Sequence, residues 1–428
     1  MERLEHIRHP RSILRDALSL QPTKPLPEEY SLAHLGKRFW RIGFGQCGLV
    51  FAIPDKPYTV FKVARPFFSD ALQNEHDVLK ALREMESELK KRDSPDQPAK
   101  ITVHLPELFK IVRYHPPATG QPDPKPYTND EDPFLEWKKD GYEFPDSEKS
   151  SSFTLPADVL FTGRIPPLPA AVRTALIQLY CDRVKQKVVE SNPVNADCLV
   201  RVYLGRRRAR TPDGTTIEPV NFGLRNYNLH LDQMLDLGLP VELYATMMAE
   251  MLAKMHWAAG TDGYDVEFVF GGSRFRRAFK DTDREHALDS EHEEGPDLTL
   301  ADMWLLDFNL CNRFGLKDID TEEMREGLVS FLVQAFFEND PYYPRPWRAV
   351  ENGGKSRKGG PSEEDVKLWR VFEEAYLEKS KAMLEWKASL SNWEEVSKEE
   401  MKLPLRFIEA CVEKQKTLPE GVDKIVPC

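Results

Sequence analysis

Three glycines near the start of the chain have the spacing of a loop that covers phosphate groups. They are Gly43, Gly45 and Gly48, and Lys62 follows at the end of the next apolar run. Glycine lets the backbone approach phosphate oxygens because it has no side chain, and a lysine ammonium directs positive charge at the same oxygens. This combination predicts a site for a phosphorylated ligand. The alternative is a glycine-rich turn that binds nothing.

The residues after Gly48 distinguish between two folds that use such a loop. In a dinucleotide-binding unit the loop opens a helix. Here residues 49–53 are β-prone and are followed by Pro54. The sequence therefore predicts a β-hairpin, with short strands and tight turns between Phe39 and Ala64.

A helix predicted from Ser69, as its cap, to about Lys91 places Glu75 on an apolar face. The apolar residues on this face recur at steps of three and four: Leu72, Leu79 and Leu82. An unpaired carboxylate on a buried face costs several kcal/mol, so we expect a cationic partner. Lys62 is the expected partner. The alternatives are a solvated Glu75 at the edge of the face or a pair with Arg65.

Asp307 follows the apolar run 303–306, so its carboxylate should emerge at the end of a strand. Asp265 directly precedes the expected partner strand, 266–270. Magnesium prefers carboxylate oxygens and usually keeps several waters, so one or two acidic side chains are enough to bind it beside a phosphate. Asp307 and the two residues after it resemble the metal-binding Asp-Phe-Gly element of protein kinases, which implies Asp307 as a Mg²⁺ ligand, with Asp265 as the expected second one.

If the chain resembles protein kinases, the segment between a core helix ending near Trp257 and the strand starting at Val266 corresponds to the catalytic loop, which would hold the base that orients an acceptor hydroxyl. Asp262 is the candidate that is left once Asp265 is assigned to the metal. The alternative is that neither aspartate takes a proton and that both form turns beside neighbouring glycines.

Two further features have simpler explanations. His256, at the expected end of the same helix, is explained by the helix dipole or by a bond to a backbone carbonyl. The basic run 206–210 is either a patch for an anionic partner or nuclear import, or the solvated end of a strand.

The glycine loop, Lys62, Glu75 and the Asp-Phe-Asn segment at 307–309 resemble the nucleotide-binding half of protein kinases, with Asn309 in place of a glycine. The resemblance implies an α+β, two-lobed fold with a small β-rich N-lobe containing one helix and a mainly helical C-lobe. It also implies ATP and Mg²⁺ as ligands. It fails in the catalytic loop, which has no His-Arg-Asp triplet and no aspartate followed five residues later by asparagine.

The chain is also similar to a fungal family of unknown function with a divergent protein-kinase-like fold, whose members often carry a zinc-finger label. The similarity covers roughly residues 35–350 and rests on the segments 164–169, 202–206, 256–269, 306–309 and 339–346. This family implies a fold and a nucleotide site, and no substrate. The six cysteines are scattered without the close pairs of a zinc site, so we expect no metal role for them.

The expected organisation has four parts. Residues 1–35 form an N-terminal arm, and 36–168 form the N-lobe with an irregular insertion near 115–152. Residues 169–350 form the C-lobe with an insertion near 273–298, and 351–428 contain a flexible loop and C-terminal helices.

Composition restricts the partners and the location. The chain has 70 acidic and 59 basic residues, and its formal charge of -11 disfavours non-specific nucleic-acid binding. No apolar run is long enough for a signal peptide or a transmembrane helix. We therefore expect a cytoplasmic protein that binds no membrane, and the basic run leaves a nuclear location open.

Three functions fit these observations. The first is an ATP-dependent phosphotransferase that acts on a hydroxyl of a protein or a small molecule. The second is a catalytically inactive pseudokinase, which binds nucleotide and presents a surface to a protein partner. The third is a scaffold whose nucleotide site has decayed.

Overall fold

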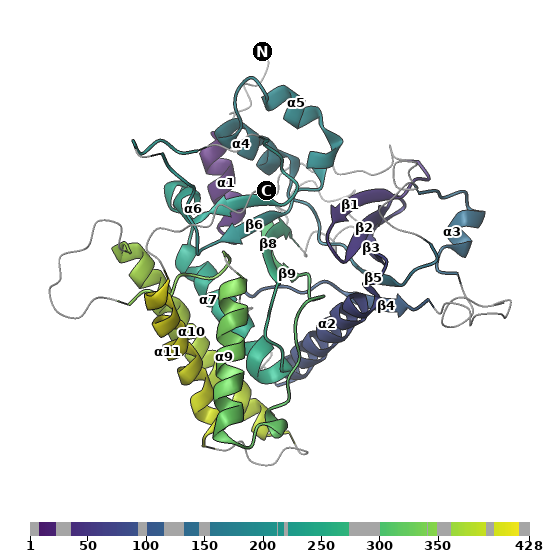
Figure 1. Cartoon of the computed structure of the whole chain (residues 1–428). Helices are drawn as coiled ribbons and strands as arrows, with labels where there is room; N and C mark the ends of the chain where they lie inside the picture. The colour runs from purple at the N-terminus through teal and green to yellow at the C-terminus, as the bar shows by residue number, and fades with distance from the viewer. Residues whose placement is uncertain are drawn as a thin grey trace, which may run out of the picture.

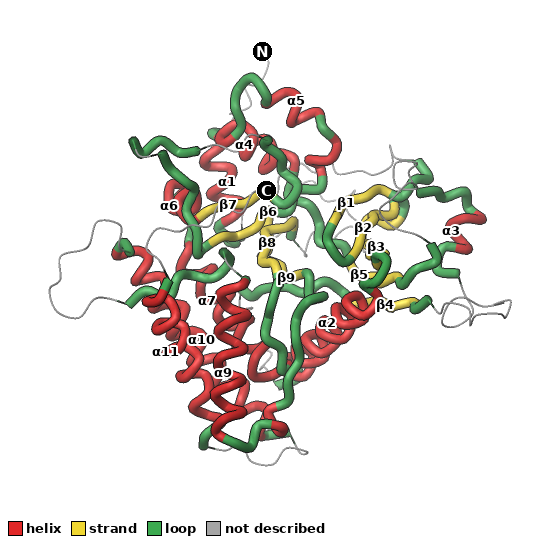
Figure 2. Tube along the Cα trace, viewed as in Figure 1, coloured by secondary structure: helices red, strands yellow, loops and turns green. Residues whose placement is uncertain are grey.

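The protein contains two β-sheets surrounded by helices, as the computed structural model shows (Figures 1 and 2). The described residues are 8–22, 36–92, 101–114, 132–144, 155–211, 213–217, 221–273, 300–339, 341–348, 361–390 and 398–418. The predicted α+β class is confirmed.

The first sheet is antiparallel and has five strands in the order β1-β2-β3-β5-β4. They are β1 (Trp40–Phe44), β2 (Gly48–Ile53), β3 (Lys56–Ala64), β4 (Leu108–Val112) and β5 (Val159–Gly163). The predicted hairpin is thus confirmed as β1 and β2. On one face, aromatic rings pack around Phe61: Phe39, Phe51, Phe134 and Trp137. Because side chains alternate along a strand, the next residue, Lys62, points to the other face.

The long helix α2 (Ser69–Lys90) packs against β4 and β5. Its buried side chains are Leu72, Val78, Leu79, Leu82 and Met85. The predicted helix is confirmed over its length, but the predicted cap is wrong. The cap residue is Phe68, which makes no side-chain cap hydrogen bond, and Ser69 is already helical.

The second sheet has four strands in the order β7-β6-β8-β9. They are β6 (Val200–Tyr203), β7 (Tyr227–His230), β8 (Glu267–Gly272) and β9 (Ala301–Leu306). The pair β6–β7 is parallel and the other two pairs are antiparallel. β9 ends directly before Asp307, as predicted.

Most helices follow the first sheet in the chain. The short helix α1 (Pro10–Leu18) precedes that sheet and packs against α4 (Ala170–Tyr180), which also contacts α5 (Gln186–Ser191). The helix α6 (Leu231–Leu237) contacts β7. The others form a bundle: α7 (Val241–Ala253), α9 (Glu322–Glu338), α10 (Glu363–Ala388) and α11 (Leu403–Thr417). α7 lies against α10 and continues into a π-helical turn, Lys254–Ala259. Such turns are frequent at functional sites.

Two segments expected to be peripheral contribute to the core. In α1, Leu14, Ala17 and Leu18 are fully buried, and the helix packs against α4, so the described part of the predicted arm belongs to the globular body. Residues 132–144 of the predicted 115–152 insertion carry α3 (Leu135–Lys139) and place Phe134 in the aromatic cluster of the first sheet. The rest of that insertion, nearly all of the insertion at 273–298 and the predicted flexible loop lie outside the described residues.

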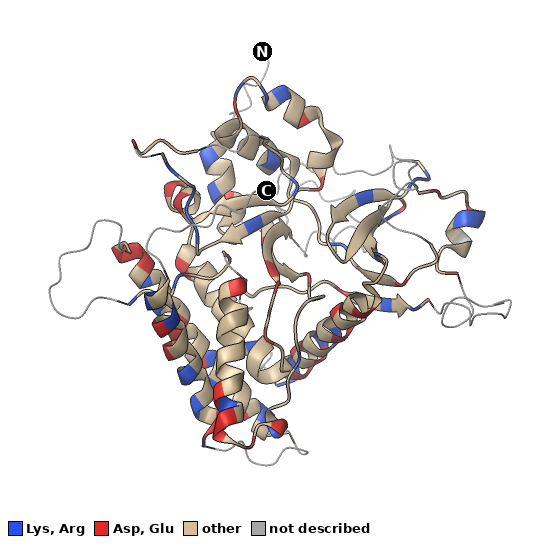
Figure 3. Ribbon diagram, in the orientation of Figure 1, with Lys and Arg blue, Asp and Glu red and all other residues tan. Residues whose placement is uncertain are grey.

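Acidic and basic residues are both spread along α10 and α11 (Figure 3). Within the described ranges, no helix combines the length and the apolar content that crossing a bilayer requires.

Candidate functional site

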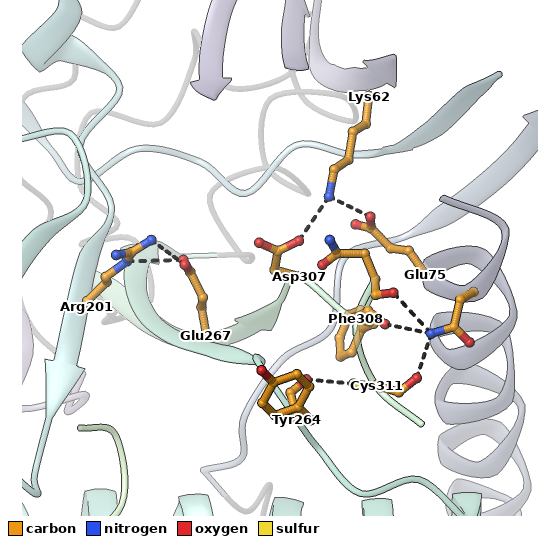
Figure 4. A network of polar contacts seen from close by, with 10 residues as sticks. Lys62, Glu75, Arg201, Tyr264, Glu267, Asp307, Phe308 and Cys311 are labelled. Atoms are coloured by element: carbon orange, nitrogen blue, oxygen red, sulfur yellow. Dashed lines mark hydrogen bonds and ion pairs between the residues drawn. The ribbon is translucent and has the colours of Figure 1, made fainter. Parts of the chain in front are cut away.

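Lys62, Glu75 and Asp307 meet at one point (Figure 4). The Nζ atom of Lys62, on β3, is 2.6 Å from Oε2 of Glu75, on α2, and 2.9 Å from Oδ1 of Asp307, directly after β9. The expected pairing of Lys62 with Glu75 is therefore confirmed. The two alternatives are wrong, because the Glu75 side chain is only 12% exposed and Arg65 stacks on the Phe44 ring instead.

Burial disfavours the charged forms of Lys62 and Glu75, and the attraction between the two side chains partly offsets this effect. Burial alone would lower the pKa of Lys62, but the Asp307 and Glu75 carboxylates raise it above its ordinary value. Burial raises the pKa of Glu75, an effect that Lys62 opposes and Asp307 reinforces. The lysine is thus a fixed positive charge, held by one carboxylate from each side.

The glycine hairpin lies directly beside Lys62. In the sheet, Gly48 pairs with Ala64 and Val50 pairs with Lys62. A Cβ atom at Gly48 would lie 2.8 Å from the Val63 carbonyl oxygen and 3.1 Å from Cγ of Lys62. Packing of the two strands therefore favours glycine at this position. The other two glycines frame the turn, where Gly45 N–H donates to the Gly48 carbonyl at 3.0 Å and Gly43 pairs with Val50.

The segment after β9 is held by a residue that sequence reasoning missed. The side-chain amide of Asn74, on α2, donates to the carbonyl oxygens of Asn309 at 3.2 Å and Cys311 at 2.6 Å. Asp307 itself has a φ of 65°, in the left-handed region that few residues other than glycine, asparagine and aspartate adopt. The helix that carries Glu75 thus also positions Asp307. The only signal of Asn74 in the sequence is its place next to Glu75.

The two predicted metal ligands, Asp265 and Asp307, are near enough for their charges to interact. Asp265 precedes β8, has an exposed side chain and a φ of 61°. Displacement of water by the surrounding protein raises the pKa of Asp265 to about 6, and repulsion from the Asp307 carboxylate adds to the effect. Two carboxylates close enough to repel each other suit a divalent cation.

Asp262 is in a different environment. It is 2% exposed, its Oδ1 accepts from the backbone N–H groups of Tyr264 (3.0 Å) and Asn312 (2.9 Å), and its Oδ2 accepts from Asn312 Nδ2 at 2.8 Å. These bonds tie the loop before β8 to the segment after β9. The geometry therefore favours the turn-forming role of Asp262 over the predicted role as a base.

A buried network connects the same loop to α10. The Tyr376 hydroxyl oxygen lies 2.8 Å from His256 Nδ1 and accepts from Trp257 Nε1 at 2.9 Å, while His256 Nε2 is 3.3 Å from the carbonyl oxygen of Asp262. A carbonyl can only accept, so Nε2 carries the proton and Nδ1 accepts from Tyr376. Burial lowers the pKa of His256 to about 3, which keeps the ring neutral. The structural explanation of His256 is thus supported.

A second ion pair lies beside Asp307, and sequence reasoning missed both of its members (Figure 4). Arg201, on β6, contacts both carboxylate oxygens of Glu267, the first residue of β8, with Nε 3.2 Å from Oε2. Burial raises the pKa of Glu267 to about 7, Arg201 opposes this, and Asp307 adds to it. In the sequence, this pair is indicated only by the presence of one charged residue, Arg201 or Glu267, within each of two otherwise apolar strands.

The basic run 206–210 is held by ion pairs within the protein. Arg207 lies 2.8 Å from Asp365 of α10, and Arg208 lies 2.9 Å from Asp232 of α6. Neither a free patch nor a solvated strand end describes these two arginines.

Part of the chain matches a known family. Residues 303–388 match the model of a domain of unknown function described as "Zinc finger protein". The match includes most of β9, Asp307, α9 and α10. No curated protein and no solved structure matches the chain.

The zinc-finger description has no counterpart in the described part of the chain. No group of three or more His, Cys, Asp or Glu side chains there could hold a metal ion, and the cysteines there are free and buried. The match therefore supports a domain-of-unknown-function family over residues 303–388.

Proposed function

We propose that the chain binds ATP together with a divalent cation and that its fold is a divergent protein-kinase-like one. The first sheet with α2 would be the N-lobe, and the second sheet with the helical bundle would be the C-lobe. The observation that carries the proposal is the position of Lys62 between Glu75 and Asp307, at 2.6 and 2.9 Å. A lysine fixed in this way directs its charge at phosphate oxygens, and the glycine hairpin beside it lets the backbone approach them.

Asp265 and Asp307 would hold Mg²⁺, and the donor set fits this ion. Both supply carboxylate oxygens, the ligands that Mg²⁺ prefers. The site contains four carboxylates and two cationic side chains, which leaves an excess of two negative charges when all are ionised: Glu75, Asp265, Glu267 and Asp307 against Lys62 and Arg201. When bound, the cation would neutralise phosphate charge.

We infer that nucleotide binding without turnover, in a pseudokinase that serves a protein partner, is better supported than transfer. The reason is the burial of Asp262, whose carboxylate oxygens are engaged by Tyr264 and Asn312. Phosphoryl transfer to a hydroxyl is the second candidate. The exposed carboxylate of Asp265 near Asp307 favours it.

A thermal-shift measurement tests the proposal without knowledge of an acceptor. ATP with Mg²⁺ should raise the melting temperature of the wild type through binding linkage. The rise should disappear in Lys62→Ala and persist in Lys80→Ala, which changes an exposed lysine on α2. A wild type whose melting temperature does not respond would contradict nucleotide binding. A phosphorylated product would instead favour the transferase.

A further inference from the structure

Asn309 contains a buried polar atom that has no hydrogen-bond partner among the described residues. It lies two residues after Asp307 and is 6% exposed. Its side-chain amide hydrogen-bonds the thiol of Cys47, in the glycine hairpin, and its Oδ1 atom receives no hydrogen bond from any described group. A buried acceptor left unpaired costs about 1–3 kcal/mol, so native proteins rarely keep one without a reason.

The surroundings of Asn309 indicate what this atom could bind. The Cys47 thiol that the amide contacts lies in the electrostatic field of Lys62, Asp307 and Glu75. The Asn309 backbone carbonyl accepts from Asn74 Nδ2 at 3.2 Å, so the backbone two residues after Asp307 is held in place. An amide oxygen beside carboxylates is a donor for a hard divalent cation.

The nearby donors do not satisfy this oxygen. The Lys62 ammonium is directed at Glu75 and Asp307, at 2.6 and 2.9 Å. The side-chain amide of Asn74 already donates to backbone carbonyl oxygens, including that of Asn309. The described part of the chain therefore leaves this oxygen available to a bound ligand.

We propose that Asn309 Oδ1 is a neutral oxygen ligand that completes, with the Asp307 carboxylate, the binding site of the divalent cation. This inference rests on the proposed function, because it assigns a ligand within that site. It also gives a role to the residue that stands where protein kinases have a glycine.

Mn²⁺ binding tests the inference directly, with Mn²⁺ as a paramagnetic probe for the cation. Free Mn²⁺ is measured by electron paramagnetic resonance with the full chain, alone and with ATP. Asn309→Ala should weaken Mn²⁺ binding about tenfold or more. ATP affinity measured in EDTA should change by less than about twofold. Asn309→Asp keeps an oxygen ligand and should still bind the cation. It therefore shows whether a loss of binding in Asn309→Ala comes from the missing oxygen or from misfolding.

Cys47→Ala is the matched control. It removes the other contact of the amide and keeps the oxygen, so Mn²⁺ affinity should stay close to that of the wild type. If Asn309→Ala binds Mn²⁺ as tightly as the wild type while ATP binding is intact, the inference is overturned and the proposed function stands. If Mn²⁺ binds through Asn309 and ATP does not bind, the cation site stands and the nucleotide function fails. A wild type that binds neither overturns both.

Discussion

Lys62 and Asp307 are 245 residues apart in the sequence, and their Nζ and Oδ1 atoms are 2.9 Å apart in the structure. Lys62 belongs to the first sheet, and Asp307 follows the last strand of the second. Their contact therefore joins the two sheets at the point where the glycine hairpin, α2 and the turn after β9 meet. A ligand bound there would contact both parts of the protein.

The contributions of Lys62 and Glu75 to the free energy of unfolding should depend on each other. Lys62→Met leaves the buried Glu75 carboxylate without its cation and should lower the free energy of unfolding by about 3–5 kcal/mol. Glu75→Gln should cost less, because Lys62 keeps its contact with Asp307 at 2.9 Å. The double variant should lose less than the sum of the two, because the buried Glu75 charge that Lys62→Met leaves unpaired is then absent. Urea unfolding of the four proteins measures the coupling. Additive losses would show that the pair does not interact.

The structure predicts that Asp262 stabilises the protein. Asp262→Ala leaves the Tyr264 and Asn312 donors without their acceptor, and we expect a loss of about 3 kcal/mol in the free energy of unfolding. ATP affinity, measured below the unfolding range, should stay within about twofold of the wild type. A stable Asp262→Ala protein that binds ATP but has lost a transfer activity of the wild type would restore the predicted base.

Gly48 and Gly45 should respond differently to alanine. A Cβ at Gly48 meets the Val63 carbonyl at 2.8 Å, whereas at Gly45 the nearest atom is 3.7 Å away. Gly48→Ala should therefore cost about 1–3 kcal/mol of unfolding free energy and weaken ATP binding by displacing β3 near Lys62. Gly45→Ala, in an exposed turn, should change stability by less than about 0.5 kcal/mol. Equal effects in chemical unfolding would contradict this packing account.

His256 should make stability depend on pH. Its pKa is lowered from 6.5 to about 3 in the folded protein, so below pH 6.5 the unfolded chain binds a proton that the folded chain excludes. The His256 contribution is fully present above pH 6.5 and is lost as the pH falls toward 3, by up to about 1.4 kcal/mol per pH unit. His256→Gln keeps a donor for the Asp262 carbonyl without titrating.

Urea unfolding at pH 7 and pH 5.5 compares the two proteins. The wild type should lose more stability than His256→Gln over this interval. Parallel curves would mean that the pKa of His256 is the same in the folded and unfolded states, which would contradict the neutral, buried ring.

The parts of the site that follow local patterns could be predicted from the sequence. The glycine spacing, the β-prone residues after Gly48 and the helical position of Glu75 all concern neighbours in the chain, and the structure confirms the resulting hairpin, helix and ion pair. Asp307 was found through its place at the end of a strand and through the resemblance to kinases.

The missed or undecided features depend on contacts between distant segments. Asp262 could be a base or a turn former until its bonds to Asn312, 50 residues away, were seen. Asn74 and the unpaired oxygen of Asn309 have no periodic signal, because each is defined by a segment that packs against it. The core role of α1 is also hidden, since Arg15 bonds the carbonyl of Leu237, 222 residues later.

The most direct test of the central claim is the dissociation constant of ATP with Mg²⁺, measured by isothermal titration calorimetry. The wild type and Lys80→Ala should bind with similar affinity, and Lys62→Ala should bind at least about tenfold more weakly, a loss of about 1.4 kcal/mol. A wild type that gives no binding heat under varied temperature, or a Lys62→Ala protein that binds as tightly as the wild type, would contradict the nucleotide site.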